Sequence, residues 1–258
     1  MKKILKLIGK TLIQFGLNPL SLIQSLRFVP RYFVGLFYFM RNSKDLKIKS
    51  LYPQLLDYFD GSGVASGHYF HQDIIVARWI YNDRPNRHVD IASRVDGFIS
   101  HLAVFRDVEI FDIRPLSTNE SNISFVCHNM MEDSTIRDLE SVSCLHSIEH
   151  FGLGRYGDPL DFNGHLKGFS NICSMLRPGG IFYFSTPVGP LRIEFNAHRV
   201  FSVSYILDNF IFKNNMEIME CALVDDNSNV FLNLDIHDGV QNNFKCNYGV
   251  LIMKLKKV

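Results

Sequence analysis

The sequence predicts an α/β protein with a Rossmann-like three-layer sandwich, in which helices cover both faces of a mostly parallel sheet of about seven strands. From about residue 83 onward, short apolar segments alternate with segments of helical spacing, as in successive βαβ units. The apolar segments are nearly continuous, which is typical of parallel strands buried on both faces. Near the C-terminus two strand-like segments follow one another without a helix, so they should pair antiparallel and end the sheet in a hairpin.

The expected elements follow one another along the second part of the chain. The first strand, HVDIA (88–92), leads into a helical segment at 97–105. A second helix is expected over 164–176, and it ends at Arg177-Pro178-Gly179-Gly180 because proline and glycine do not continue a helix. The remaining strands are expected at 108–113, 123–127, 142–147, 181–186, 216–224 and 248–255.

The composition is that of a globular protein with a substantial core. Of 258 residues, 47% are hydrophobic and 21% are charged. The formal net charge of +1 argues against a general nucleic-acid binder. The five cysteines are odd in number and form no CxxC pair, which indicates a reducing, cytoplasmic compartment without a disulfide framework or a cysteine-based zinc site.

The first part of the chain lacks the alternation and is strongly basic. We expect residues 1–60 to form a basic and aromatic helical extension, and residues 61–258 to form the Rossmann-like domain. Two interpretations of residues 1–44 stay open: a packing extension that covers the core domain, or a basic amphipathic segment that lies on the inner face of an anionic membrane. The basic residues before the first acid, Asp45, are Lys2, Lys3, Lys6, Lys10, Arg27, Arg31, Arg41 and Lys44.

The turn after the first strand, within VDIASRVDG (89–97), lies where doubly wound proteins bind a nucleotide. Ala92 and Ser93 stand where such turns usually have glycines, and only Gly97 remains. Asp112 ends the second strand, where a carboxylate can hold ribose hydroxyls. Because a pyrophosphate needs several free amides, this turn suits a phosphate-free cofactor better than a dinucleotide, which disfavours a nicotinamide-linked oxidoreductase.

These segments resemble the motifs of class I S-adenosylmethionine-dependent methyltransferases. VDIASRVDG resembles their first motif and FDIRPL (111–116) their acidic strand end. The resemblance covers residues 88–258. GHYFHQD (67–73) and VGPLRIEFNAHR (188–199) resemble a bacterial methyltransferase-like family of unknown function. Later motifs are similar in the same order: SCLHSIEHFG (143–152), LRPGGIFYFSTP (176–187) and AHRVFSVSYILDNF (197–210).

The resemblance implies that S-adenosyl-L-methionine is the cofactor and that a small polar acceptor, such as a sugar or surface-glycan intermediate, receives the methyl group. Asp112 would hold the ribose. A methyltransferase-like protein that binds or scaffolds without catalysis remains the alternative. The other positions implied for the cofactor are Asp90, Ala92, Ser93 and Gly97 around its methionine part and Ile113, Asn129 and Met130 around its adenine.

The segment His146-Ser147-Ile148-Glu149-His150 allows two interpretations. Its letters match H-x-x-E-H, a zinc peptidase pattern that needs a helix to bring both histidines to one face. Because VSCL before it reads as a strand, this interpretation is disfavoured and no metal is expected. As part of a methyltransferase, His150 would be the base that takes the acceptor's proton, and Glu149 would orient it. The alternative is that both residues only cap a helix or bond to the backbone.

Residues after the fifth strand and in the loop 152–161 are candidates for the acceptor side. His198 is a second candidate base, and Arg199 would suit a phosphate or carboxylate on the acceptor. The alternative for this pair is a surface ion pair. Tyr156 lies in the glycine-rich loop GLGRYGDPLD (152–161), which is expected to act as a lid over the substrate or, alternatively, as a plain surface connection.

Overall fold

The computed structural model describes residues 9, 11–42 and 46–258, which fall into two compact units, Met1–Val64 and Ala65–Val258. The first unit is built around one long helix, α2 (Pro19–Asn42), which contains Pro30. A single 3-10 turn, η1 (Asp57–Phe59), packs on it, with the Tyr58 ring 5.0 Å from that of Phe28 and 4.5 Å from the Arg31 guanidinium.

Within the described residues, no helix combines the length and apolar character that a bilayer crossing requires. Five of the basic residues in the segment 1–44, for which a membrane contact is one of the two interpretations, lie outside the described residues. They are Lys2, Lys3, Lys6, Lys10 and Lys44.

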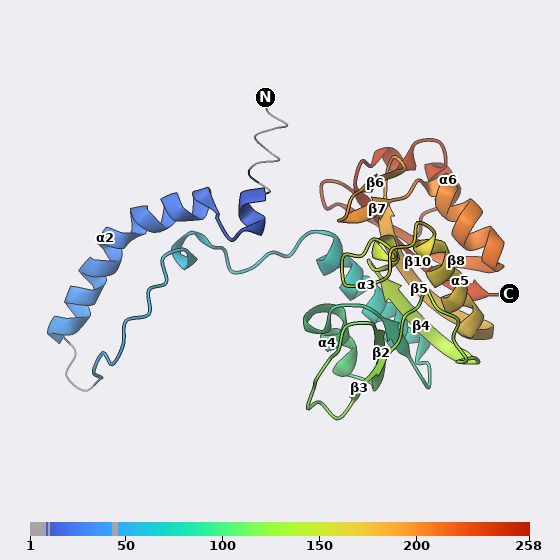
Figure 1. Ribbon diagram of the computed structural model, residues 1–258, viewed down its shortest axis with the longest axis horizontal. Helices are drawn as coiled ribbons and strands as arrows, with labels where there is room; N and C mark the ends of the chain where they lie inside the picture. The colour runs from blue at the N-terminus through green and yellow to red at the C-terminus, as the bar shows by residue number, and fades with distance from the viewer. Residues whose placement is uncertain (1–8, 10, 43–45) are drawn as a thin grey trace. The chain divides into compact units, whose positions relative to one another are not determined.

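The second unit contains an eight-stranded sheet with the order β3-β2-β1-β4-β5-β10-β8-β9 (Figure 1). Strands β1 to β5 pair in parallel, whereas β10 is antiparallel to both of its neighbours. The strands are β1 (Val89–Ile91), β2 (Val108–Asp112), β3 (Ile123–Cys127), β4 (Leu139–Leu145), β5 (Leu176–Val188), β8 (Met216–Val224), β9 (Val230–Phe231) and β10 (Gly249–Lys257).

This topology confirms the predicted Rossmann-like fold and its antiparallel C-terminal pair. The last strand, β10, does not extend the sheet at its edge but inserts between β5 and β8. The short edge strand β9 pairs with β8 and makes the eighth strand. A separate two-stranded sheet, β6 (Arg192–Glu194) and β7 (His198–Val200), follows β5.

Helices cover both faces of the sheet and bury two apolar cores. One core packs α3 (His68–Asp83) and α4 (Ser100–Ala103) against the sheet. The other packs α5 (Gly164–Met175) and α6 (Val203–Ile206) on the opposite face. Here the rings of Phe169 and Phe210 stack 4.7 Å apart. Offset and edge contacts of this kind add to the stability that apolar burial provides.

The predicted helix at 97–105 forms only in part. A π-type turn, η2 (Val95–Ile99), precedes the four-residue helix α4. Gly97 lies inside η2 with a non-helical backbone (φ −120°, ψ −109°), so the helix cannot run continuously from this residue. The remaining short turns are η3 (Ile148–His150), η4 (Leu207–Ile211), η5 (Phe212–Asn214), η6 (Ile236–Gly239) and η7 (Asn243–Lys245).

Candidate functional site

A cavity of about 400 Å³ lies at the carboxyl ends of the parallel strands, where open α/β sheets bind their ligands. We call one end the nucleoside end, after the ligand predicted there; it is formed by the turn after β1 and by the residues that end β2 and follow β3. The other, where the acceptor is predicted, is called the acceptor end; it is formed by the residues that follow β4, by the loop 152–161 and by the first two turns of α3.

The turn after β1 adopts the backbone expected of a glycine turn without the glycines. Ala92 has a φ of 60°, in the left-handed region that glycine occupies more readily. The Asp90 carboxylate stabilises the turn by accepting hydrogen bonds from the Ser93 amide (3.0 Å) and from the hydroxyls of Ser93 (2.9 Å) and Ser143 (2.5 Å). Ala92, Ser93 and Gly97 line the cavity, as their predicted positions require.

Asp90 itself does not reach the cavity, and the prediction that it contacts the cofactor is wrong. Its side chain is 0% exposed and all its hydrogen bonds go to neighbouring residues. Burial raises the pKa of Asp90 to about 7, although the hydrogen bonds from Ser143 and Ser93 oppose the rise. Asp90 therefore stabilises the turn after β1 without lining the cavity.

Asp112 lines the nucleoside end of the cavity, and its carboxylate is held by Arg114. The Arg114 Nε lies 3.0 Å from Asp112 Oδ1 and its Nη2 lies 2.5 Å from Oδ2, a bidentate fork. The Arg114 guanidinium also lies 4.7 Å from the ring centre of Tyr156. The Arg114 side chain is 43% exposed, so part of it faces solvent.

The three residues predicted around adenine also line the cavity. Ile113 follows Asp112, and Asn129 and Met130 follow β3. The Asn129 side chain is fixed by accepting a hydrogen bond from the Met131 amide (3.1 Å) and by donating one to Glu132 (2.9 Å). Ile113 and Met130 give this end apolar walls beside one carboxylate, the mixture that a nucleoside needs.

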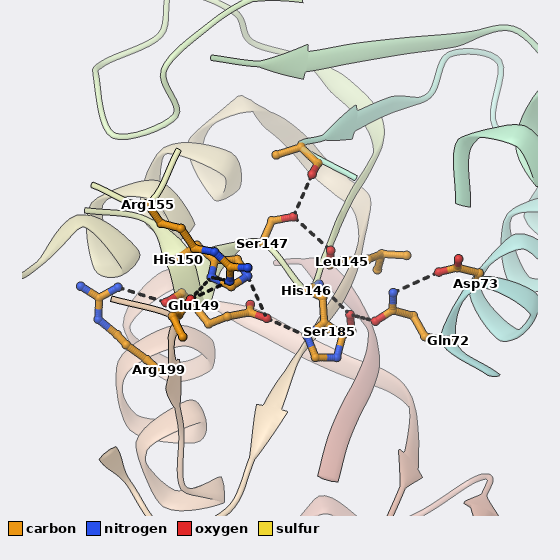
Figure 2. A network of polar contacts seen from close by, with 12 residues as sticks. Gln72, Asp73, Leu145, His146, Ser147, Glu149, His150, Arg155, Ser185 and Arg199 are labelled. Carbon is orange, nitrogen blue, oxygen red and sulfur yellow. Dashed lines mark hydrogen bonds and ion pairs between the residues drawn. The ribbon is translucent and has the colours of Figure 1, made fainter. Parts of the chain in front are cut away.

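At the acceptor end, His146 and Glu149 form a buried pair. The His146 Nδ1 lies 2.7 Å from Glu149 Oε1, and the two residues are 6% and 1% exposed. Burial alone would raise the pKa of Glu149, but the charge and hydrogen bond of His146 outweigh it and lower this pKa below its usual value. Figure 2 shows this pair together with His150 and with the chain of contacts from Ser185 to Gln72 and Asp73.

His150 also lines the cavity, and the backbone fixes its tautomer. Its Nδ1 lies 2.7 Å from the carbonyl oxygen of Ala197, so Nδ1 carries the proton and Nε2 is bare. The bare Nε2 lies 3.9 Å from Glu149 Oε1. Burial lowers the pKa of His150, which keeps the ring neutral near pH 7. A catalytic role for His150 thus stays a prediction that its position permits.

The backbone does not provide the helix that the zinc pattern requires. β4 ends at Leu145, His146 takes a left-handed conformation (φ 49°), and only the short turn η3 follows. The two histidines and the glutamate are therefore not presented from one helical face. In the part of the chain that the structure describes, no group of three or more His, Cys, Asp or Glu side chains is arranged to hold a metal ion.

Arg199 does not face the cavity, contrary to the prediction that it binds the acceptor. It is 3% exposed and donates hydrogen bonds to the carbonyls of Glu149 (3.3 Å), Phe151 (2.7 Å) and Phe162 (3.2 Å). Arg199 therefore ties the segment after β4 to the end of the loop 152–161. His198, the second candidate base, also stays behind the cavity wall, where its ring lies 6.4 Å from that of His150 and 5.1 Å from that of Tyr248.

The loop 152–161 is held in shape by one aspartate. Asp158 accepts hydrogen bonds from the amides of Gly152 (2.8 Å), Gly154 (3.2 Å) and Tyr156 (3.2 Å). Tyr156 and Arg155 of this loop line the cavity, and binding of the acceptor by Tyr156 stays a prediction.

Several cavity residues were not predicted from the sequence. Arg155 lies in the glycine-rich loop 152–161, but the residues next to it in the sequence do not distinguish it from an arginine on the surface. Tyr69 and Gln72 belong to GHYFHQD (67–73), a segment noted only for its resemblance. His146 was considered only as a zinc ligand. Its proximity to Glu149 depends on the left-handed turn at residue 146, which the sequence does not announce.

Comparisons with known proteins agree with this geometry. Residues 118–255 match the family described as "Caenorhabditis protein of unknown function, DUF268". A comparison with curated proteins finds no match. Among solved structures, an S-adenosylmethionine-dependent methyltransferase from Clostridium acetobutylicum superposes with a TM-score of 0.51, at 13% identity, over 75% of this chain and 93% of its own.

Two further solved structures have the same TM-score of 0.51, each at 10% identity. An O-methyltransferase from a trans-AT PKS multienzyme of Brevibacillus brevis, in complex with S-adenosyl-L-homocysteine, matches over 73% of this chain and 72% of its own. The [4+2]-cyclase SpnF matches over 76% of this chain and 85% of its own. At these identities the likeness shows the fold, and it confirms the predicted resemblance to class I methyltransferases.

Proposed function

Since the chain belongs to the DUF268 family, a family of unknown function, and has the class I methyltransferase fold, we propose that it transfers a methyl group from S-adenosyl-L-methionine to a small polar acceptor. The observation that carries the proposal is the cavity at the carboxyl ends of the strands, with Asp112 at the tip of β2. The cavity joins a nucleoside end to an acceptor end that contains buried titratable groups.

The residues at the nucleoside end fit the cofactor. Arg114 already presents two parallel N–H donors to the two oxygens of Asp112. The vicinal hydroxyls of a ribose offer the same two donors, so they can replace the guanidinium fork. Ile113 and Met130 would flank the adenine, and the turn at Ala92 and Ser93 would receive the methionine part. When bound, the cofactor supplies an activated methyl group, and the protein's contribution is alignment and proton transfer.

The acceptor end favours a polar, anionic substrate. Among the described arginines that line the cavity, Arg94 is paired with Asp96 and Arg114 with Asp112. Arg155 forms no salt bridge with a described carboxylate; it donates to the carbonyl of Ala197 (2.8 Å) and lies 5.0 Å from the Tyr156 ring. A phosphate or carboxylate on the acceptor, as in a sugar or glycan intermediate, would satisfy its remaining donors. Arg155 thereby takes the role first expected of Arg199.

Calorimetric titration of the full chain with S-adenosylhomocysteine tests the proposal. We expect one site per chain, and Asp112→Asn should weaken binding about tenfold to a hundredfold, since a hydrogen bond to a charged group is worth about 1.5–3 kcal/mol. Asp107→Asn is the matched control, because Asp107 is exposed and does not line the cavity. Absence of binding to the unmodified chain would refute the proposal and leave the non-catalytic scaffold as the better account.

A further inference from the structure

We propose that His146 and Glu149 form the general base of this site, and that the acceptor is therefore a hydroxyl or amine that must lose a proton. The inference rests on the proposed function and assigns the base to a residue other than His150. Both members are buried, and His146 lines the acceptor end of the cavity. Figure 2 shows the two side chains turned toward one another across the turn after β4.

The hydrogen bond between the two residues fixes the state of the imidazole. Glu149 is ionised and can only accept, so the Nδ1 of His146 donates across the 2.7 Å contact. The proton of a neutral ring is thus on Nδ1, and Nε2 keeps its lone pair. Nε2 is buried and has no hydrogen-bond partner among the described residues. An unsatisfied buried acceptor in a cavity wall is suited to a ligand's O–H or N–H.

The ring is also held in place on its remaining sides. His68 stacks on it with ring centres 5.6 Å apart and planes 13° apart, and Tyr69 lies 5.0 Å away. The backbone amide of His146 donates to the carbonyl and the hydroxyl of Ser185, each at 3.1 Å. The φ of 49° is a conformation that a non-glycine residue adopts at a cost, and such outliers gather at functional sites.

Comparison with His150 decides which ring is the base. The Nδ1 of His150 is bonded to a neutral carbonyl, whereas that of His146 is bonded to a buried carboxylate. A carboxylate stabilises the imidazolium that forms when the ring takes a proton, and it does so more strongly at 2.7 Å than at the 3.9 Å that separates it from His150. His150 then serves as a neutral wall of the acceptor end.

The proposed methyl transfer is a displacement at the methyl carbon, coupled to the loss of a proton from the acceptor. The acceptor's O–H or N–H proton passes to Nε2 of His146, and the lone pair of the same oxygen or nitrogen forms the bond to the methyl carbon. The carbon–sulfur bond breaks and its electron pair stays on sulfur, which becomes a neutral thioether. The positive charge moves from the sulfonium to an imidazolium that is paired with Glu149.

Nitrogen-15 NMR of the histidine rings in the full chain, saturated with S-adenosylhomocysteine, tests the dyad without a known acceptor. At a pH high enough for the ring of His146 to be neutral, we expect its proton on Nδ1, and this signal should vanish in His146→Gln and remain in His150→Gln. Glu149→Met, which removes the acceptor, should populate both tautomers, and Glu149→Gln should restore the Nδ1–H form. Retained binding of S-adenosylhomocysteine shows that each variant is folded.

Two results would overturn the inference while leaving the proposed function intact: an Nε2–H tautomer for His146, or a tautomer that does not respond to Glu149→Met. Both presuppose cofactor binding, so they are distinct from failure of the proposed function. For an acceptor found in a panel of small hydroxyl and amine compounds, His146→Gln should lower kcat about 10²–10⁴-fold. Glu149→Gln should lower kcat although it preserves the tautomer, and His150→Gln should act mainly on KM.

A second inference rests on α2 alone: we infer that this helix docks on an anionic lipid surface. Its residues Leu22, Leu26, Phe33, Phe37 and Met40 recur at helical spacing on one face and are 47–63% exposed. The opposite side is mixed and carries Arg27 and Arg31 next to the exposed side chains of Val34 and Tyr38. No Asp or Glu occurs among the described residues up to Asn42. A second copy of the helix would bring arginines together, whereas anionic lipid complements them.

Co-sedimentation of the full chain with vesicles tests this docking. We expect binding to vesicles that contain phosphatidylglycerol and little binding to phosphatidylcholine alone. Phe33→Ser with Phe37→Ser should reduce binding about tenfold or more, because each buried aromatic ring is worth about 1.5–3 kcal/mol. Arg27→Gln with Arg41→Gln should reduce binding to the anionic vesicles only. A chain that stays in the supernatant, or that forms a dimer through α2 instead, contradicts the inference.

Discussion

Asp90→Asn is expected to lose about 3 kcal/mol of stability relative to the unmodified chain as the pH falls from 7 to 4. Burial raises the pKa of Asp90 to about 7, far above the 3.8 of an exposed aspartate. The folded state therefore binds this proton more tightly than the unfolded state. Its contribution to stability is complete below pH 3.8 and is lost as the pH rises through 7. Asparagine cannot titrate, so the variant lacks the gain on acidification.

The measurement is the free energy of unfolding from urea titrations between pH 4 and 7.5. The informative quantity is the difference between Asp90→Asn and the unmodified chain at each pH, because other titrating groups contribute equally to both. The matched control is Asp107→Asn, at an exposed position. If the difference in unfolding free energy between Asp90→Asn and the unmodified chain does not change with pH, the pKa of Asp90 is not raised by burial.

His88→Gln is expected to have the opposite effect, a relative gain of about 3 kcal/mol between pH 6.5 and 4. Burial, followed by the charge of Arg106, lowers the pKa of His88 to about 3 from 6.5. The unfolded state then binds the proton more tightly, so the contribution of His88 is present above pH 6.5 and is lost as the pH falls. Glutamine keeps donor and acceptor atoms near the hydroxyls of Ser141 (2.7 Å) and Ser143 (3.0 Å) and removes the titration.

The same urea titrations detect this effect, with His237→Gln as the exposed control. The hydroxyl of Ser143 donates a hydrogen bond to Asp90 and also contacts His88, so the two titrating side chains share one hydrogen-bond partner. In the unmodified chain they act in opposite directions, and their pH dependences largely cancel. A difference in stability between His88→Gln and the unmodified chain that does not change with pH would show that His88 is not the group responsible.

The centre of the sheet could be predicted from the sequence because β1, β2 and β4 are buried almost throughout and are therefore largely apolar, although the edge strand β3 is partly exposed. Strand β3 was predicted to the residue, and β8 exactly matches the expected segment 216–224. The insertion of β10 between β5 and β8 was not predicted. Two antiparallel strands have the same local pattern whichever of them pairs with the rest of the sheet.

Positions near the strand ends were predicted well, and the direction of individual side chains was not. Asp112, Asn129 and Met130 face the cavity because parallel strands end at one edge of the sheet. The resemblance implies a cofactor contact for Asp90, and the charge of Arg199 suggests an acceptor contact, yet each is buried and forms hydrogen bonds within the chain. The pairing of His146 with Glu149 depends on the left-handed backbone of His146. The spacing of apolar residues does not predict such a conformation at a single residue.

The Arg114 fork sets an order of events for any reaction at this site. Under the proposed function, ribose hydroxyls that take both oxygens of Asp112 would displace the guanidinium, and the apparent affinity for the nucleoside would be reduced by the fraction of molecules in which the fork is closed. Arg114 already rests against Tyr156, at the side from which the acceptor is approached. Once released, its positive charge becomes available there. The first ligand thereby prepares the entrance for the second, and compulsory-order kinetics with the cofactor leading are the natural outcome.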